Sequence, residues 1–413
     1  MRQAGYAGAV LPLVVETVAA DDIGLLIPLL DSRDPLLFIR RGEGVAGIGE
    51  ALRLEFTGPN RLADAAAAWR EVVAAATITD PVGLPGSGLV ALGSFAFSEH
   101  SAATSVLIVP QVVVGRRNGH SWITRINAPS SPIPIPTNLG HEYRISLRPG
   151  ALSAEGFVEA VDAAIAEIAT GTVRKVVLAR DLIGRLPEGA DLRRVLTYLA
   201  LGYPDSFTYA VNGLVGSSPE TLVRVDRGTV TARVLAGTIG RGADAEADLA
   251  ASVALATSTK DLDEHQFAIG SVMGSLREHS STLVASDQPF TLKLPNLWHL
   301  ASDVVGELSD GSTSLDLVGA LHPTAAVAGN PTLAALDAIE RLEPFDRGRY
   351  AGPVGWVDAA GDGEWAVALR CAHVSSSGRI TAYAGAGIVR DSVAVAELAE
   401  TKMKFRPIVE AFS

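Results

Sequence analysis

Cysteine is almost absent from this chain of 413 residues, which contains only Cys371. A single thiol cannot form an intramolecular disulfide, and it cannot supply the cluster of thiolates that a cysteine metal site requires. The residues around it, Ala368 to Ala372, are typical of a strand, so we expect Cys371 to be a buried, inert thiol. A reducing cytoplasm is the compartment that best fits this composition.

Long apolar runs and basic runs are missing as well. No stretch of 18 apolar residues occurs, so no membrane-spanning helix is expected. The apolar stretch 4–15 loosely resembles a secretion signal, but Pro12 and the poor cleavage site favour a short strand. The net charge of −12 and the lack of a Lys/Arg-rich segment argue against nucleic acid and anionic membranes as partners. A local basic pocket could still bind a small anion.

Apolar residues, by contrast, are abundant, at 48% of the chain against 19% charged residues, so a large core is expected. The length predicts two or three domains, or one large layered domain. A segment rich in proline and serine, 128–138, is the best candidate for a linker or surface loop. We therefore divide the chain into an N-terminal part (1–127), this segment, and a C-terminal region (139–413), and expect one compact domain overall.

Turn signals and hydrophobic periodicity predict strands in antiparallel runs, with helices between them. The expected strands are 38–40, 45–49, 89–97, 106–114, 173–186, 207–216, 221–226, 229–235, 350–358, 363–375 and 379–389. The expected helices are 60–76, 153–169, one from about Ser258, and one from about Ser392 that is disturbed at Pro407. This order indicates an α+β fold with large sheets rather than a doubly wound parallel sheet.

Two acidic pairs lie far apart on helical patterns: Asp261 with Glu264, and Glu397 with Glu400. A spacing of three residues places both carboxylates of a pair on one helix face. The other stripe of the first helix, expected to face the core, contains Leu262, Ile269, Met273 and Leu276. Either pair alone could be a solvated face. Four carboxylates brought together would repel one another unless a hard cation such as Mg²⁺ lay between them.

Further motifs occur in a fixed order between about residues 150 and 407. They are Lys175-Val-Val-Leu-Ala-Arg180, Ser218-Pro219-Glu220, Leu235-Ala236-Gly237-Thr238, Lys260-Asp261-x-x-Glu264-His265, His299-Leu300, His322-Pro323-Thr324, Tyr350-Ala-Gly-Pro353, Ala368-Leu369-Arg370, Ala384-Gly385-Ala386-Gly387 and Glu397-x-x-Glu400-Thr401-x-x-Lys404. Together they resemble the chorismate-utilising enzymes: isochorismate, salicylate, anthranilate and aminodeoxychorismate synthases. The resemblance implies one large α/β sandwich of mainly antiparallel sheets with outer helices.

The resemblance also implies a ligand set. Mg²⁺ would bind the ring carboxylate of chorismate through Glu264 and Glu400, with Asp261 and Glu397 acting through metal-bound water. This division suits an ion that keeps several of its waters. The remaining substrate contacts implied are Gly237, Thr238, His299, Ala326, Tyr350, Arg370, Gly385, Gly387 and Lys404. Taken singly, these could equally be a strand-edge arginine, turn glycines, a structural histidine and a surface lysine.

By the same resemblance, Lys175 is the general base that activates water for attack at ring C2. Glu220 is the acid that assists loss of the C4 hydroxyl. An unperturbed lysine with a pKa near 10.4 is neutral in about one molecule in 2,500 at pH 7, and an unperturbed glutamate near 4.3 is protonated in about one in 500. The site must therefore lower one pKa and raise the other by burial and neighbouring charge. The alternative reading is an exposed strand-end lysine and a loop acid.

Residues at three positions distinguish the different synthases of the chorismate-utilising family that this sequence resembles. The ammonia-using relatives lack a lysine at position 175, and aminodeoxychorismate synthases carry a nucleophilic lysine where this chain has Ala236. Salicylate synthases commonly carry threonine where this chain has Ala326. The sequence therefore predicts a Mg²⁺-dependent isochorismate synthase, an isomerase that interconverts chorismate and isochorismate for either menaquinone or siderophore synthesis.

We also expect the protein to be a monomer that has no obligatory glutamine amidotransferase partner. Salicylate synthase is the second hypothesis, and an amidotransferase-coupled synthase is the third. A catalytically inactive acidic scaffold or metal-binding module is the alternative from another class.

Overall fold

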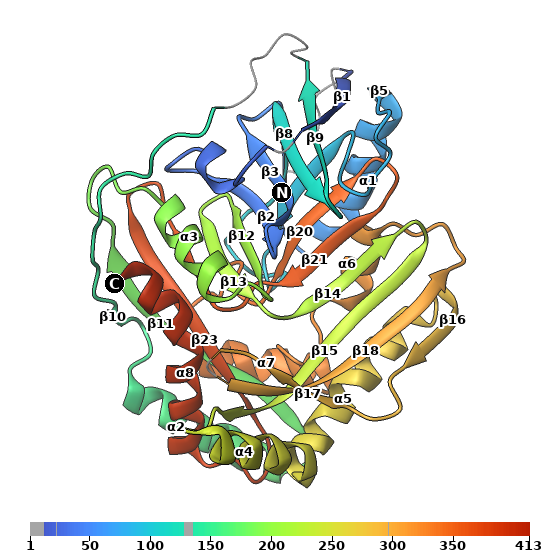
Figure 1. Ribbon diagram of the computed structural model, residues 1–413. Coiled ribbons are helices and arrows are strands. Elements are labelled where there is room, and N and C mark those ends of the chain that lie inside the picture. Colours follow the sequence, from blue (N-terminus) through green and yellow to red (C-terminus); the bar gives the residue numbers. More distant parts are fainter. Residues whose placement is uncertain (1–11, 22, 128–134, 296) are drawn as a thin grey trace.

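Two large sheets face each other in the computed structural model, which describes residues 12–21, 23–127, 135–295 and 297–413. Helices lie outside the sheets (Figure 1). Every described strand pair is antiparallel except β1 with β5, so the expected α+β sandwich of mainly antiparallel sheets is confirmed.

The first sheet has 13 strands in its described part. They are β1 (Val14–Ala20), β2 (Leu36–Arg40), β3 (Glu43–Ile48), β5 (Thr77–Thr79), β8 (Val112–Arg117), β9 (His120–Ile126), β10 (Arg148–Pro149), β11 (Lys175–Arg185), β12 (Phe207–Val211), β13 (Leu214–Ser218), β19 (Gly329–Asn330), β22 (Cys371–Val374) and β23 (Arg379–Ile388).

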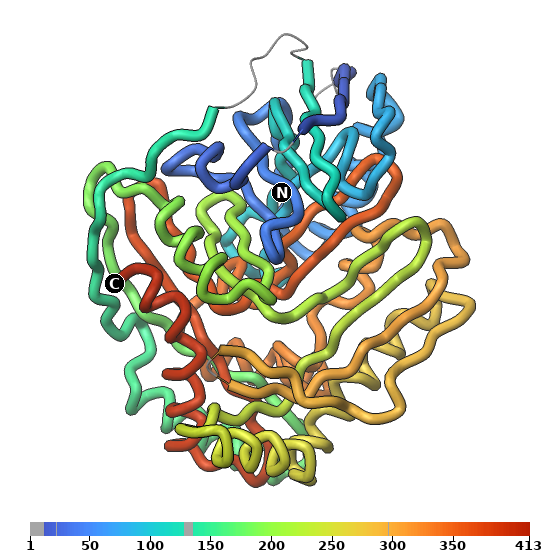
Figure 2. The backbone as a smooth tube through the Cα atoms, in the orientation of Figure 1, coloured from blue at the N-terminus to red at the C-terminus, as the bar shows by residue number. Residues whose placement is uncertain are grey.

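Among the described residues, the second sheet has ten strands. They are β4 (Leu52–Phe56), β6 (Val90–Ser94), β7 (Ser105–Val109), β14 (Thr221–Asp226), β15 (Thr229–Gly240), β16 (Ser280–Ala285), β17 (Phe290–Lys293), β18 (Leu297–Leu308), β20 (Pro353–Asp358) and β21 (Gly363–Val367). Strand β20 pairs with β6, so late strands of the chain lie beside the N-terminal ones (Figure 2).

The helices form layers on either side of the sheets. They are α1 (Arg61–Ala75), α2 (Ala154–Ala169), α3 (Arg193–Gly202), α4 (Ala245–Thr257), α5 (Thr259–Leu276), α6 (Ser314–Leu321), α7 (Thr332–Leu342) and α8 (Ala394–Phe412), with a short 3₁₀ helix η1 (Ile27–Leu29). Side chains alternate along a strand. On β2, Phe38 accordingly joins the core between the sheets, whereas Leu37 and Ile39 pack in the layer that contains α3 and α8 residues.

Two segments that were each predicted to be a single strand form two strands in the structure. The segment 207–216 is the hairpin β12–β13, which turns at Asn212 and Gly213, both with positive φ. The segment 363–375 is β21 in one sheet and β22 in the other, and Arg370 between them has φ 49°. Alternation of apolar residues continues across both breaks, so the pattern alone did not reveal them.

Helix α5 begins as predicted, with Ser258 Oγ accepting a hydrogen bond from the Asp261 N–H at 3.3 Å. Its inward face differs from the prediction. The fully buried residues are His265, Ala268, Val272 and Leu276. The expected core stripe is only half-buried apart from Leu276, because the face that carries Glu264 packs toward β15.

Helix α8 continues through Pro407 to Phe412, so the predicted disturbance does not end it. Helices α3, α4, α6 and α7 and strands β16 to β18 were not predicted. Among the described residues, no helix has both the length and the apolar character needed to cross a membrane. Cys371 is buried as predicted, and burial raises the pKa of its thiol to about 12.

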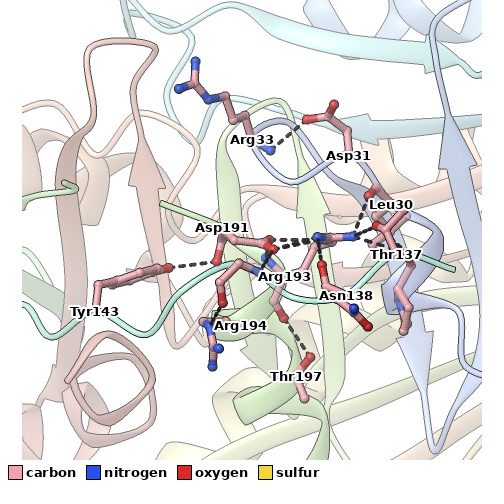
Figure 3. Close-up of polar contacts among 12 residues, drawn as sticks. Leu30, Asp31, Arg33, Thr137, Asn138, Tyr143, Asp191, Arg193, Arg194 and Thr197 are labelled. Atoms are coloured by element: carbon pink, nitrogen blue, oxygen red, sulfur yellow. Dashed lines mark hydrogen bonds and ion pairs between the residues drawn. The ribbon is translucent and has the colours of Figure 1, made fainter. Parts of the chain in front are cut away.

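Residues 128–134 of the predicted linker lie outside the described residues. The described end of the segment is held by Arg193, whose guanidinium donates to Thr137 Oγ1 at 2.5 Å and to the Asn138 carbonyl at 2.9 Å (Figure 3). Arg193 also forms a buried ion pair with Asp191 at 2.7 Å. This part of the segment is therefore attached to the start of α3.

Candidate active site

A pocket opens where strands β11, β15, β18 and β23 meet helices α5 and α8. Every site residue predicted from the sequence lines it except Lys175, which lies directly behind it against Glu264. The residues that line it are Glu220, Gly237, Thr238, Asp261, Glu264, His299, Ala326, Tyr350, Arg370, Gly385, Gly387, Glu397, Glu400 and Lys404. Both acidic pairs, from α5 and α8, thus reach a single pocket.

Lys175 is the first residue of β11 and is completely buried, with an exposed fraction of 0%. Its Nζ lies 3.0 Å from Glu264 Oε1. Burial is the largest influence and by itself would raise the pKa of Glu264, but the charge and hydrogen bond of Lys175 together with the charges of Lys404 and Lys260 outweigh it, so this pKa is lowered. A Cβ on Gly387 would lie 2.7 Å from Glu264 Oε1 and 3.2 Å from Lys175 Cε, so the glycine makes room for this ion pair.

Glu220 lies between β13 and β14, where the chain passes from one sheet to the other. Its side chain is buried, and this desolvation raises its pKa to about 7 despite the opposing charges of Lys175, Lys404 and Arg370. A carboxyl group with this pKa is protonated in a large fraction of molecules near neutral pH. This is the state that a general acid needs.

Lysines accompany the carboxylates of the two helices. Lys404 Nζ lies 2.6 Å from Glu400 Oε1, and Lys260 Nζ lies 3.4 Å from Glu397 Oε1. Within the described ranges, no group of three His, Cys, Asp or Glu side chains is close enough to hold a metal by itself. A metal at this site would therefore need water or ligand oxygens in addition to the carboxylates.

A hydrogen-bonded chain crosses one wall of the pocket. Gly237, with φ 82°, forms a bulge in β15 that places Thr238 opposite His299. His299 Nδ1 lies 3.0 Å from Thr238 Oγ1 and 3.3 Å from the Gly237 carbonyl, and its Nε2 lies 3.3 Å from Arg370 Nη2. Arginine can only donate, so Nε2 accepts and Nδ1 carries the proton. The neutral imidazole therefore orients the Arg370 guanidinium.

Arg370 is buried and has a left-handed backbone, which is a strained conformation for a residue with a side chain. Near it, Tyr350 stacks on Tyr383 with ring centroids 5.2 Å apart. Lys404 donates to the Gly385 carbonyl at 3.0 Å, next to its ion pair with Glu400. The pocket thus offers a guanidinium, an ammonium and a phenol to an anionic ligand.

His265 does not line the pocket. It is buried beneath it, with Nδ1 3.2 Å from the Ala236 carbonyl and Nε2 2.9 Å from Ser302 Oγ. These bonds attach α5 to β15 and β18, so His265 has a structural role.

Two polar residues that line the pocket, Lys260 and Tyr383, were not identified from the sequence. Lys260 precedes Asp261 in a recognised motif, and its adjacency to three acids was a usable signal. Tyr383 gave no signal, because its contact with Tyr350 joins residues from different strands and loops.

The sequence pattern of the family described as "chorismate binding enzyme" matches residues 31–132 and 137–413. Isochorismate synthase DhbC of Bacillus subtilis (strain 168) is 40% identical over 284 residues, which cover 66% of this chain and 70% of the relative. Isochorismate synthase MenF of the same strain is 31% identical over 309 residues, covering 74% and 65%. The crystal structure of DhbC from Bacillus anthracis is similar with a TM-score of 0.78 and 30% identity, covering 94% of this chain and 98% of that one. This chain is therefore a member of the chorismate binding enzyme family.

Proposed function

We propose that the protein is an isochorismate synthase that interconverts chorismate and isochorismate. One observation carries the proposal: a buried lysine and a buried glutamic acid with a pKa of about 7 meet at a pocket that also contains four helix-borne carboxylates. The named relatives, which are isochorismate synthases, support the same reaction.

In the proposed reaction, Lys175 acts in its neutral amine form, not as the ammonium that pairs with Glu264, and takes a proton from the water that attacks ring C2. Glu220 gives its proton to the C4 hydroxyl, which leaves as water, while both ring double bonds shift by one position. One water is consumed and one released, so the reaction is an isomerisation. Both residues return to their starting states once a proton passes from Lys175 to Glu220, directly or through solvent.

Arg370, Tyr350 and Lys404 are suited to the two carboxylates of chorismate. Arg370 is held in place by His299, and a pre-oriented guanidinium can bind a carboxylate through two hydrogen bonds. The buried position of Arg370 excludes competing water, which strengthens this attraction.

Mg²⁺ is the proposed cofactor, with Glu264 and Glu400 as ligands and Asp261 and Glu397 acting through water. The oxygen-only donor set fits a hard divalent cation. Burial and then the repulsion of Glu400 raise the pKa of Glu397, and a bound cation would stabilise its charged form. When bound, Mg²⁺ would supply the charge that holds and neutralises the ring carboxylate.

The direct test is incubation of the purified protein with chorismate and Mg²⁺, with products separated by chromatography. We expect isochorismate at an equilibrium ratio with chorismate, reached from either side, and no product with Lys175→Ala. Accumulation of pyruvate and salicylate would instead favour the salicylate synthase alternative, which Ala326 in the pocket wall argues against. Product formed only with ammonia would indicate the amidotransferase-coupled branch. Absence of any chorismate conversion would overturn the proposed function.

A further inference from the structure

A second and much smaller cavity adjoins Glu220. It has a volume of about 10 Å³ and is lined mostly by apolar side chains of β14, β15 and α5. Glu220 and Ala326 line both this cavity and the substrate pocket, so the two spaces meet at these residues. A volume of this size is at the lower limit, roughly 10–15 Å³, for one water molecule.

The small cavity also contains the side chain of Thr324, which is 4% exposed. Thr324 Oγ1 is buried and forms no hydrogen bond with any described residue. A buried hydroxyl without a partner costs about 1–3 kcal/mol, and such groups in native proteins nearly always bond to protein or to ordered water. The loop around it is fixed, because the Thr324 carbonyl accepts from the N–H groups of Val327 and Ala328 at 3.1 and 3.0 Å.

The carboxyl group of Glu220 also lacks a hydrogen-bond partner among the residues that the structure describes. Within the described part of the chain, no ion pair or hydrogen bond holds its carboxyl group; the residue is 6% exposed, and its carboxyl oxygens open onto the substrate pocket rather than being sealed off like Thr324 Oγ1. Two polar groups that lack partners therefore line one cavity of the size of a water molecule, and the other lining side chains are apolar apart from Thr221 and Arg233.

We propose that this cavity holds a single structural water, hydrogen-bonded to Thr324 Oγ1 and to the carboxyl group of Glu220, and that Thr324 is thereby a positioning residue for Glu220. The water accepts from the threonine hydroxyl and donates to one carboxyl oxygen. The other oxygen is left to carry the proton toward the pocket. The role in catalysis rests on the proposed function, in which Glu220 is the acid, whereas the water site itself does not.

Such a water would fix the orientation of the Glu220 carboxyl group. A carboxyl group in an apolar setting has no fixed partner and can rotate, which moves its proton away from the reacting oxygen. A buried hydrogen-bonded network fixes the rotamer. Small misplacements of a reacting group have large effects on rate.

The test compares Thr324→Val, which keeps the shape and removes the hydroxyl, with Thr324→Ser, which keeps the hydroxyl. We expect Thr324→Val to lower kcat for chorismate by roughly ten- to a hundredfold with little change in KM, and Thr324→Ser to retain most of the wild-type kcat. Thr124→Val is the matched control, because Thr124 is equally buried but bonds Thr17 Oγ1 at 2.9 Å in the N-terminal part. It should change stability without changing kcat.

A spectroscopic measurement separates positioning from general damage. The infrared band of the protonated Glu220 carboxyl, identified by its loss in Glu220→Gln, should shift in Thr324→Val and not in Thr324→Ser. A high-resolution crystal structure should show one water in the cavity. An unchanged kcat and band in Thr324→Val, or a dry cavity, would overturn the inference. If Thr324→Val does not fold, Thr324→Ser and Thr324→Ala allow the same comparison. If wild-type protein does not convert chorismate, the proposed function fails, while the band and the crystallographic water still decide the water site.

Discussion

At the scale of single residues, the raised pKa of Glu220 makes the free energy of unfolding depend on pH. Its pKa is raised from 4.5 to about 7 in the folded protein. Between pH 4.5 and about pH 7, the Glu220 carboxyl binds a proton more often in the folded state than in the unfolded state. The free energy of unfolding therefore falls as the pH rises through this range. The loss is at most about 3 kcal/mol when complete above pH 7.

Replacing Glu220 with glutamine should remove this effect. Glu220→Gln is expected to abolish chorismate conversion and yet to be more stable than wild type at pH 8, because a neutral amide replaces a buried charge. Near pH 4 the two proteins should be equally stable, since Glu220 is then protonated in both states. Urea unfolding at both pH values measures this, and equal stability at pH 8 would contradict a raised pKa.

Gly387 provides a second prediction at this scale. In Gly387→Ala, the new methyl group would lie 2.7 Å from Glu264 Oε1, so the ion pair with Lys175 must move. We expect kcat to fall at least tenfold, because misplacement of a reacting group is costly. Gly270→Ala on α5 meets nothing within 4 Å and serves as the control, with full activity and slightly higher stability. Steady-state kinetics and thermal unfolding of both variants test this, and full activity of Gly387→Ala would place Lys175 outside the reaction.

At the scale of elements, helices α5 and α8 carry the carboxylates of the proposed metal site on their inner faces. Glu264→Gln keeps the shape of the side chain but removes a proposed ligand charge, so we expect Mg²⁺ affinity to fall roughly 10- to 100-fold, as for changes around other metal sites. Calorimetric titration with Mg²⁺ measures this independently of activity.

Asp263→Asn is the matched control for the same helix, because Asp263 is adjacent in sequence but exposed. Its Mg²⁺ affinity should equal that of wild type, and both variants should unfold at temperatures close to that of wild type. Wild-type Mg²⁺ affinity in Glu264→Gln would rule out the metal assignment.

At the scale of the whole molecule, Arg193 attaches the segment that follows the N-terminal strands to α3. Arg193→Met would leave Asp191 buried without its ion-pair partner and release Thr137 and Asn138 (Figure 3). We expect a loss of about 3 kcal/mol in the free energy of unfolding, with kcat unchanged at temperatures where the protein is folded.

Arg194→Met tests the specificity of that effect. Arg194 is the next residue and donates one hydrogen bond to the Gly140 carbonyl at 2.7 Å, but its ion-pair partner Glu142, at 3.7 Å, is 88% exposed. Exposed pairs contribute about 0–1 kcal/mol, so denaturant unfolding should show a much smaller change. Equal losses in the two variants would show that Arg193 has no special role in joining the segments.

Features of the site that involve residues close together in the sequence were predictable, whereas contacts between distant residues were not. The spacing of Asp261 and Glu264 and the start of their helix near Ser258 are local features, and the structure shows both. The inner face of α5 was predicted only in part: Ile269, Met273 and Leu276 pack against the core as expected, but the buried face also includes His265 and Ala268. The acidic residues Asp261 and Glu264 line the pocket that α5 shares with α8.

The sequence by itself determined the chemistry of this protein: which acids, bases and cations it carries, their spacing on each helix, and their membership of one family. Tertiary structure alone decided the pairings, such as Lys260 with Glu397 across 137 residues, the placement of Lys175 against Glu264, and the cavity between Thr324 and Glu220. The physical reason is that periodicity and turn preference are properties of neighbouring residues. Burial, pKa and contact, in contrast, arise only when distant elements pack together.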